Sequence, residues 1–233
     1  MATKQVSAFA DDGMKATVDA LLGDIAALYR EDHIPWVIGY SGGKDSTAVL
    51  QLVWLALSKM TPDQHHKPVH VISTDTLVEN PVVATWVGRS LNAMTTAAAK
   101  QGLPIQAHRL TPLPVDSFWV NLLGKGYPAP RPKFRWCTER LKIKPSTRFI
   151  MDVVKANGEA ILLLGTRKQE SQARGRNMEK HERRRMRDKL SPNASLPNSL
   201  IYSPIETWAN DDVWQFLMQV KNCLLYTSDA ADE

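Results

Sequence analysis

The segment from Pro35 to Ser58 constrains the fold of this chain more than any other. It opens with the apolar run WVIGY, typical of a buried strand, and closes with TAVLQLVWLALS, which has the apolar density of a core-facing helix. Between them lies the turn SGGKDS, residues 41–46. A glycine-rich turn that leads from a strand into a helix predicts a site for phosphate groups, because the helix start offers N–H groups and a positive dipole end.

The side chains of this turn suit the same ligand. Gly42 and Gly43 let the backbone turn sharply and approach an anion closely. Lys44 supplies a mobile positive charge, and the hydroxyls of Ser41 and Ser46 can donate hydrogen bonds to phosphate oxygens. A simple glycine turn between a strand and a helix is the alternative that the turn alone leaves open.

The turn is not a Walker A motif. That motif needs glycine five residues before the Gly-Lys pair and serine or threonine after the lysine, but Ile38 and Asp45 stand there. Asp45 could position Mg2+ or hold the loop in shape. SGGKDS instead resembles the PP-loop of ATP pyrophosphatases, enzymes that split ATP between its α and β phosphates.

Composition fits one globular α/β domain. The chain has 233 residues, 43% of them hydrophobic, and no apolar run long enough to cross a membrane. Its first residues, MATKQVSAFADDG, lack the pattern of a signal peptide, so we expect a cytoplasmic location and no membrane contact. Two cysteines are too few for a disulfide framework or a four-cysteine metal site.

Charge is distributed unevenly. The chain carries a net +5, but residues 125–148 hold eight Lys or Arg and one acid, and residues 165–190 hold ten against four. The rest of the chain is therefore acidic. Basic segments of this kind favour a polyanion such as nucleotide phosphates or nucleic acid. For the arginines at 183–187, which alternate with acids, a helix surface with ion pairs is an equal alternative.

Hydrophobic periodicity predicts alternating helices and strands. Apolar runs predict strands at 36–40, 68–73, 105–110 and 160–164; helical patterns cover 14–30, 47–58, 82–99, 141–155 and 211–221. Residues 111–132 are rich in Pro and Gly, which indicates a long loop around a short helix at 115–123. Strands separated by helices predict a doubly wound parallel sheet, whose ligands bind beyond the carboxyl ends of its strands.

Two further segments follow predicted strands and are candidate parts of the site. Thr74 and Asp75 follow the second strand, where the carboxylate could accept hydrogen bonds from a ribose or simply cap a helix. Gly165 and Thr166 follow the fourth strand, with Arg167 and Arg174 close behind. The glycine permits close approach of the backbone, and the arginines could hold phosphate unless they are ordinary surface residues.

Cys137 stands in the segment FRWCTERLK, among three basic residues. Nearby cations favour the thiolate, which is the reactive and metal-binding form. A small buried core residue is the equal alternative.

Together these segments resemble one family, the Dnd-type DNA phosphorothioation sulfurtransferases, which are relatives of phosphoadenosine phosphosulfate (PAPS) reductases within the PP-loop group. The resemblance runs from about 33 to 220. Motifs general to the group are SGGKDS, the Cys-x-x-x-Leu-Lys stretch from Cys137, GTRKQES from Gly165, and SPIETWANDDVW. Motifs more specific to the Dnd branch are TDTLVENPVVATWV, GKGYPAPRPKFRWCTERLK and LSPNASLPNSLIYSPI.

The resemblance implies an adenine nucleotide alpha hydrolase-like fold and a transferase that cleaves ATP to AMP and pyrophosphate, activating a DNA backbone phosphate for sulfur insertion. Lys44, Asp45 and Arg167 would be catalytic, with Arg174 beside the phosphates. It also implies Mg2+, an iron-sulfur cluster with Cys137 as one ligand, and three kinds of partner: DNA, a cysteine desulfurase that donates sulfur, and other Dnd-type proteins.

The sequence departs from this family at its end. Further cysteines of the family have no counterpart, and residues 222–233, NCLLYTSDAADE, resemble translated read-through, so Cys223 is not expected to be a ligand. We therefore expect an N-terminal helix at 1–32, a PP-loop domain at 33–220 and an aberrant tail at 221–233. A cluster on this chain alone is doubtful because such clusters generally use four thiolates.

Two other functions stay open at this point. A PAPS reductase-type oxidoreductase would need a redox cysteine tail, and no Glu-Cys-Gly-Leu-His-like tail is present. A non-catalytic, nucleotide-gated DNA-binding subunit would bind DNA without turning over ATP.

Overall fold

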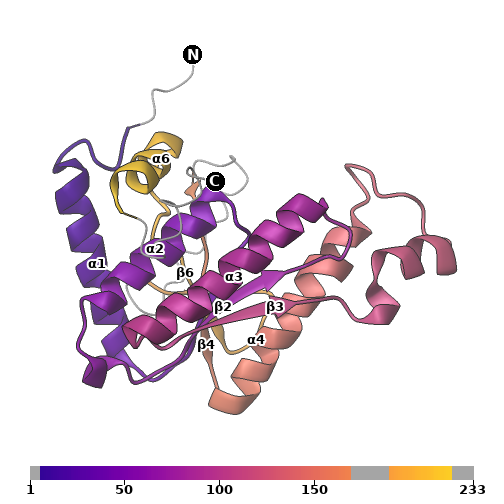
Figure 1. Ribbon diagram of the computed structural model, residues 1–233, viewed down its shortest axis with the longest axis horizontal. Helices are drawn as coiled ribbons and strands as arrows, with labels where there is room; N and C mark the ends of the chain where they lie inside the picture. The colour runs from indigo at the N-terminus through magenta and orange to yellow at the C-terminus, as the bar shows by residue number, and fades with distance from the viewer. Residues whose placement is uncertain (1–5, 169–188, 222–233) are drawn as a thin grey trace.

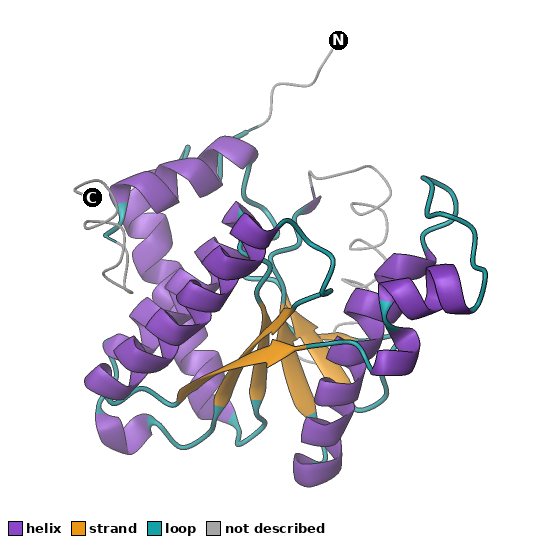
Figure 2. Ribbon diagram, turned by 45° about the vertical axis from the view of Figure 1, so that its right-hand side comes forward, coloured by secondary structure: helices purple, strands orange, loops and turns teal. Residues whose placement is uncertain are grey.

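The computed structural model describes residues 6–168 and 189–221, which form a sheet covered by helices on both faces (Figures 1 and 2). The sheet order is β3-β2-β1-β4-β6-β5, and all neighbours are parallel except the pair of β5 and β6. The strands are β1 (Trp36–Gly39), β2 (Val69–Thr74), β3 (Ile105–Leu110), β4 (Ala160–Leu163), β5 (Ser191–Pro192) and β6 (Ser199–Tyr202). This confirms the predicted doubly wound parallel sheet.

Helices of different lengths connect the strands. The α-helices are α1 (Gly13–Glu31), α2 (Lys44–Ser58), α3 (Pro81–Gln101), α4 (Lys144–Asn157) and α6 (Asn210–Gln219). Shorter helical turns are η1 (Pro62–Gln64), η2 (Pro114–Asp116), η3 (Val120–Gly124) and η4 (Thr138–Ile143). Within the described ranges, no helix combines the length and hydropathy needed to span a bilayer.

Alternation along the central strands divides the core between the two faces. Trp36 and Ile38 of β1 pack into the larger cluster with α1, α2, α3 and α6, whereas Val37 joins the smaller cluster under α4. Successive side chains of a strand point to opposite faces, so a strand buried on both sides must be apolar throughout. Burial of all four residues of β4 follows the same rule.

Strand order fixes where a ligand can bind. The chain runs from β1 outward to β2 and β3, then returns to place β4 on the other side of β1. Ile38 of β1 is in register with Val71 of β2 and Leu163 of β4. The crevice at the carboxyl ends of β1 and β4 is therefore the point where the strand order reverses, which is where ligands bind in sheets of this type.

Departures from the predicted elements have local causes. The helix expected at 141–155 is continuous with η4, so the helical run begins before residue 141 and continues through α4 to Asn157. The short helix expected at 115–123 is two separate turns, η2 and η3. Strands β5 and β6 were not predicted, because SLIY is too short and too mixed to stand out among neighbouring polar residues.

A histidine pair joins β2 and β3. The Nδ1 atom of His70 lies 3.1 Å from Nε2 of His108, and both rings contact Phe149 of α4. Burial lowers the pKa of both histidines, and the neighbouring His108 lowers the pKa of His70 further. The folded protein therefore holds both side chains neutral near neutral pH.

This pair should make the protein less stable in mild acid. Below about pH 6.5, the ordinary pKa of histidine, the unfolded chain binds protons that the folded chain resists, so the free energy of unfolding falls as pH falls. Urea unfolding at pH 7.5 and pH 5.5 measures the effect, and the variant His108→Gln should show a smaller loss between the two pH values. An equal loss in wild type and variant would contradict it.

Candidate functional site

The turn after β1 is closed by its own serines. Gly42 adopts a φ of 73°, a conformation that favours glycine. The Ser46 hydroxyl donates to the Gly43 carbonyl at 2.9 Å and accepts from the Ser41 backbone N–H at 3.2 Å. Among the residues that the structure describes, no side chain caps the start of α2 at Lys44. The N–H groups of its first turn therefore stay available for an anion, while Ser46 shapes the loop.

Three charged residues meet at this turn. Asp45 Oδ2 lies 2.8 Å from Nζ of Lys44, and its Oδ1 lies 2.8 Å from Nε of Arg167. The second contact is an ion pair without hydrogen-bond geometry. Arg167 is 5% exposed, and its Nη1 atom donates to the Trp208 carbonyl at 3.4 Å. The predicted catalytic residues thus come together, with Asp45 bridging the two cations.

Gly165 allows the segment that carries Arg167 to lie close to the turn that carries Lys44 and Asp45. A Cβ atom at Gly165 would lie 2.8 Å from the backbone carbon of Asp45 and 3.0 Å from the backbone nitrogen of Ser46. The segment after β4 therefore touches the backbone of the first turn of α2.

A pocket of about 320 Å³ opens beside the turn. Its walls come from the ends of β1 and β2, from α3, and from the start of α4. The lining residues are Gly39, Tyr40, Ser41, Ile72, Ser73, Thr74, Asp75, Glu79, Ala84, Val87, Arg109, Lys142 and Ser146. The volume lies at the lower end of the range for small-molecule sites. The predicted Thr74 and Asp75 line this pocket.

Asp75 is held ionised at the pocket wall. Both Nε and Nη2 of Arg109 donate to its carboxylate, and its Oδ1 accepts from the Leu77 N–H at 2.8 Å. Burial alone would raise the pKa of Asp75, but these hydrogen bonds and the charge of Arg109 together hold it below the ordinary value. The Asp75 carboxylate therefore accepts from Arg109 and from the Leu77 N–H instead of capping a helix.

Other pocket residues were not predicted from the sequence. Arg109, Glu79, Lys142 and Ser146 reach the pocket because β2 pairs with β3 and α4 packs near β2. Lys142 pairs with Glu79 at 2.9 Å, and Ser146 meets Thr74 with 3.1 Å between their hydroxyl oxygens. Trp86 of α3 packs on Gly42. The only sequence signal for these residues was the basic character of residues 125–148, which include Lys142.

Of the predicted site residues that the structure describes, only Ser41, Thr74 and Asp75 line the pocket, and the others lie outside its walls. The Thr166 hydroxyl lies 2.8 Å from the Ser203 hydroxyl, after β6. Cys137 is half-buried in the segment before α4; of its basic neighbours, Arg140 pairs with Asp116 and Lys142 with Glu79. Arg174 lies outside the described residues. Within 6–168 and 189–221, no three His, Cys, Asp or Glu side chains gather as a metal site.

Comparison with known proteins agrees with this arrangement. The model of the phosphoadenosine phosphosulfate reductase domain family matches residues 35–229. An uncharacterized protein of Methanocaldococcus jannaschii is 26% identical over 200 residues, which cover 86% of this chain and 35% of that protein. The chain thus spans about a third of the length of this curated relative.

Two solved structures share the fold. The NAD+ synthetase from Burkholderia pseudomallei aligns with a TM-score of 0.52 and 11% identity, covering 90% of this chain and 76% of that one. The U34-tRNA thiolase NcsA from Methanococcus maripaludis, solved with its 4Fe-4S cluster, aligns with a TM-score of 0.50 and 13% identity, covering 90% and 66%. These likenesses confirm the adenine nucleotide alpha hydrolase-like fold. With most of its length matched by the family model, the chain belongs to the phosphoadenosine phosphosulfate reductase domain family.

Proposed function

We propose that this chain is a PP-loop ATP pyrophosphatase that serves as the sulfurtransferase of DNA phosphorothioate modification. The observation that carries the nucleotide part is the contact of Lys44, Asp45 and Arg167 at the reversal point of the sheet, beside a pocket. The DNA part rests on the motifs it shares with the Dnd branch, at residues 74–87, 124–142 and 190–205.

The geometry suggests how ATP is bound and cleaved. The nucleoside occupies the pocket, with Asp75 accepting hydrogen bonds from ribose hydroxyls. The β and γ phosphates lie on the turn, against the free N–H groups at the start of α2 and the ammonium group of Lys44. Charge that develops on the departing pyrophosphate is stabilised by these fixed donors, with Arg167 behind Asp45.

Bond changes follow from this placement. A non-bridging oxygen of a DNA phosphate attacks the α phosphorus of ATP, the bond to the bridging oxygen breaks, and pyrophosphate leaves with its electron pair. The product is a DNA phosphate that carries AMP. The terminal sulfur of a persulfide on a cysteine desulfurase then attacks the DNA phosphorus, and the bond to AMP breaks. A second thiol cleaves the S–S bond, which gives a disulfide with the desulfurase and leaves the sulfur on the DNA phosphate. Other Dnd-type proteins are the further expected partners.

Mg2+ and the iron-sulfur cluster, which the family resemblance implies, fit this chain less well. Both carboxylate oxygens of Asp45 already contact cations, so the structure favours a loop-shaping role over Mg2+ binding. Mg2+ commonly reaches such sites on the phosphates of the substrate. The sequence has two cysteines, fewer than the four thiolates of an iron-sulfur cluster, so no step here passes through one.

A reductase of PAPS is the second candidate, and the description of the matching family favours it. The same turn and pocket would then hold a nucleotide that already carries sulfate. Release of sulfite from PAPS with a thiol reductant, without cleavage of ATP, would identify this activity.

The products formed from ATP test the proposal. The purified chain, with MgCl2 and DNA, should give AMP and pyrophosphate, separated from ADP and phosphate by ion-exchange chromatography. Lys44→Ala should lower the rate by roughly 100-fold, because it removes a charge that stabilises the leaving group. Lys59→Ala, on the exposed far end of the same helix, is the matched control and should keep full activity.

Each other result has a distinct meaning. ADP and phosphate, or AMP formation that survives Lys44→Ala, would contradict the proposal. Nucleotide binding without turnover under any of these conditions would favour the non-catalytic, DNA-binding function.

A further inference from the structure

An arm projects from the domain between β3 and α4. The arm, residues 111–143, extends to the right of the sheet in Figure 1. It has its own internal contacts: Asp116 Oδ1 lies 2.6 Å from Nη1 of Arg140, and the ring of Trp136 stacks on Phe118 with centroids 5.4 Å apart. Nε1 of Trp136 also donates to the Pro128 carbonyl at 2.9 Å. The arm is therefore held in shape by its own internal contacts and is not an unsupported loop.

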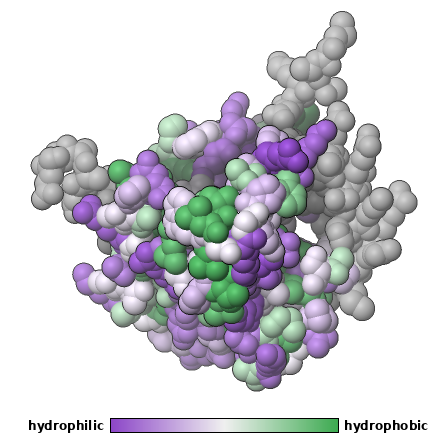
Figure 3. All heavy atoms as spheres, turned by 90° about the vertical axis from the view of Figure 1, so that its right-hand side faces the viewer, coloured by the Kyte–Doolittle hydropathy of each residue, from purple (hydrophilic) through white to green (hydrophobic). Residues whose placement is uncertain are grey.

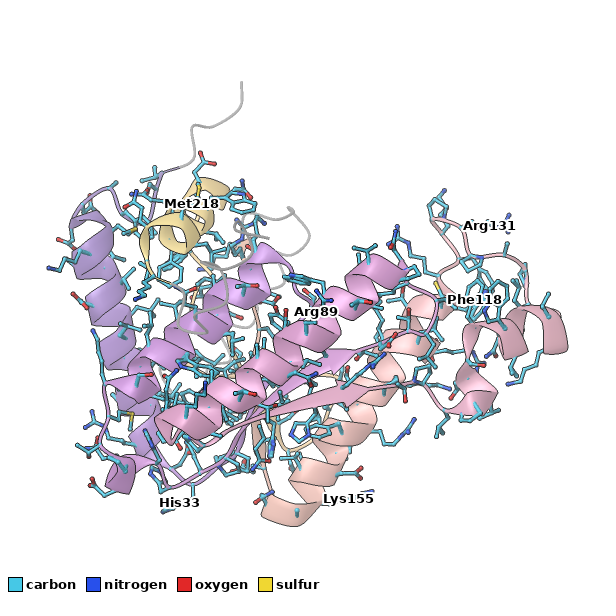
Figure 4. All side chains as sticks on the ribbon, viewed as in Figure 1. His33, Arg89, Phe118, Arg131, Lys155 and Met218 are labelled. Atoms are coloured by element: carbon cyan, nitrogen blue, oxygen red, sulfur yellow. The ribbon has the colours of Figure 1, made fainter. Side chains whose placement is uncertain are left out.

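The tip of the arm, residues 131–135, displays one aromatic ring among cations. Arg131 and Phe134 exchange two backbone hydrogen bonds, of 3.1 and 2.8 Å, which fix a tight turn. Phe134 is 41% exposed, and Arg131, Lys133 and Arg135 are exposed around it. Figure 4 labels Arg131 at the outer end of the arm. An exposed phenyl ring held by such a turn is well placed to meet a ligand.

The cations of the tip differ from those at the base of the arm. Arg140, Lys142 and Lys144 each pair with a carboxylate. Arg131, Lys133 and Arg135 form no ion pair with any residue that the structure describes. Charge of one sign, left without internal partners around an exposed ring, indicates a ligand that is both anionic and planar.

We infer that the tip binds a strand of DNA with unpaired bases, its cations holding backbone phosphates and Phe134 stacking on a base. Single-stranded nucleic acid is bound in general by this combination of positive charge and aromatic platforms. The inference deepens the proposed function, on which its choice of DNA rests, because it names the strand state and the side chain that contacts the base.

Position links the tip to the nucleotide pocket. The base of the arm contributes Lys142 to the pocket wall, and Ser146 of the adjoining α4 lines it too. A strand held at the tip can therefore run along the arm toward the site of ATP cleavage. Figure 3 faces the arm and shows hydrophobic side chains gathered on it, in keeping with its exposed Leu113, Val115, Val120 and Leu123. These aliphatic residues precede the aromatic and cationic tip in the sequence.

Fluorescence anisotropy with labelled oligonucleotides tests the inference. Without ATP, the chain should bind single-stranded DNA more tightly than the duplex of the same sequence. Phe134→Ala should weaken single-strand binding roughly tenfold and leave the salt dependence unchanged, since only stacking is lost. Lys133→Ala combined with Arg135→Ala should lower the slope of log affinity against log salt by about 1.4.

Controls separate the tip from the rest of the surface. Trp214→Ala on α6, 48% exposed, and Lys155→Ala at the far end of α4 should leave DNA binding unchanged. DNA binding is measured without ATP and by a readout separate from product analysis, so failure of ATP cleavage and failure of this inference can be told apart. An RNA strand of the same sequence shows whether the strand is recognised as DNA.

Three results would overturn the inference. The first is unchanged single-strand affinity in Phe134→Ala. The second is duplex DNA or RNA binding tighter than single-stranded DNA. The third is equal affinity for polyglutamate of matched charge, which would make the tip a surface for acidic proteins. Retained affinity in Phe134→Trp, with loss in Phe134→Ala, would support stacking directly.

Discussion

Gly165→Ala should lower both the stability of the protein and its rate of ATP cleavage, although it adds a single methyl group. Its Cβ would lie 2.8 Å from the backbone carbon and 2.9 Å from the carbonyl oxygen of Asp45. Backbone atoms cannot swing aside as a side chain does, so the start of α2 must shift. We expect the free energy of unfolding to fall by about 1–3 kcal/mol. ATP cleavage should fall roughly 100-fold, because a small displacement of the turn misplaces the phosphates.

Gly88→Ala provides the matched control. Gly88 lies within α3 and has no neighbour within 4 Å of an added Cβ atom. Alanine there should raise the free energy of unfolding by about 0.5–1 kcal/mol and leave ATP cleavage unchanged. Urea unfolding and product analysis on both variants measure the difference. If Gly165→Ala behaved like Gly88→Ala, the close approach of the two segments would not exist in solution.

Asp45→Ala should be the second severe change. It removes the carboxylate between Lys44 and Arg167, and the buried guanidinium of Arg167 then loses its ion-pair partner among the described residues. Breaking a buried pair from one side commonly costs about 3–5 kcal/mol, and the partial exposure of Asp45 places this variant near the lower limit. ATP cleavage should fall with it, since Lys44 loses the contact that positions its ammonium group.

A double variant separates the charge effect from the loss of packing. Asp45→Ala combined with Arg167→Met removes both charges, so it should recover a good part of the stability lost in Asp45→Ala. ATP cleavage should stay low in the double variant. Thermal unfolding of the single and double variants gives the coupling between the residues. Additive losses would show that Asp45 and Arg167 act independently.

The two central strands, β1 and β4, were predictable because they are apolar on both faces. The runs that became β1 and β4 need no partner to be recognised, and the glycine turn after β1 identifies the site by its composition. Strand β6 escaped prediction because its pairing with β4 comes from the tertiary structure, not from its own sequence. Propensity in short strands is decided largely by such neighbours.

Part of the site was predictable because several of its residues directly follow strands that the sequence reveals. Lys44, Asp45, Asp75 and Arg167 follow strands or turns that the sequence marks clearly. Arg109 could not be assigned, because its contact with Asp75 depends on the alignment of β3 with β2. Cys137 shows the reverse: two of its three basic neighbours in the sequence, Arg140 and Lys142, pair with carboxylates elsewhere in the structure. Sequence neighbours are therefore a poor guide to the charges that surround a side chain in the folded chain.

The pairing of β4 with β1 also determines when, during folding, the protein becomes able to bind a nucleotide. The turn at 41–46 is synthesised early, but its supporting Gly165 and Arg167 arrive only when Ile161 pairs with Trp36. Pairings between distant parts of a chain form slowly because the intervening loop must close first. We therefore expect the nucleotide to bind late in folding. A nascent chain that ends before β4 would contain the complete phosphate-binding motif but would not bind ATP tightly.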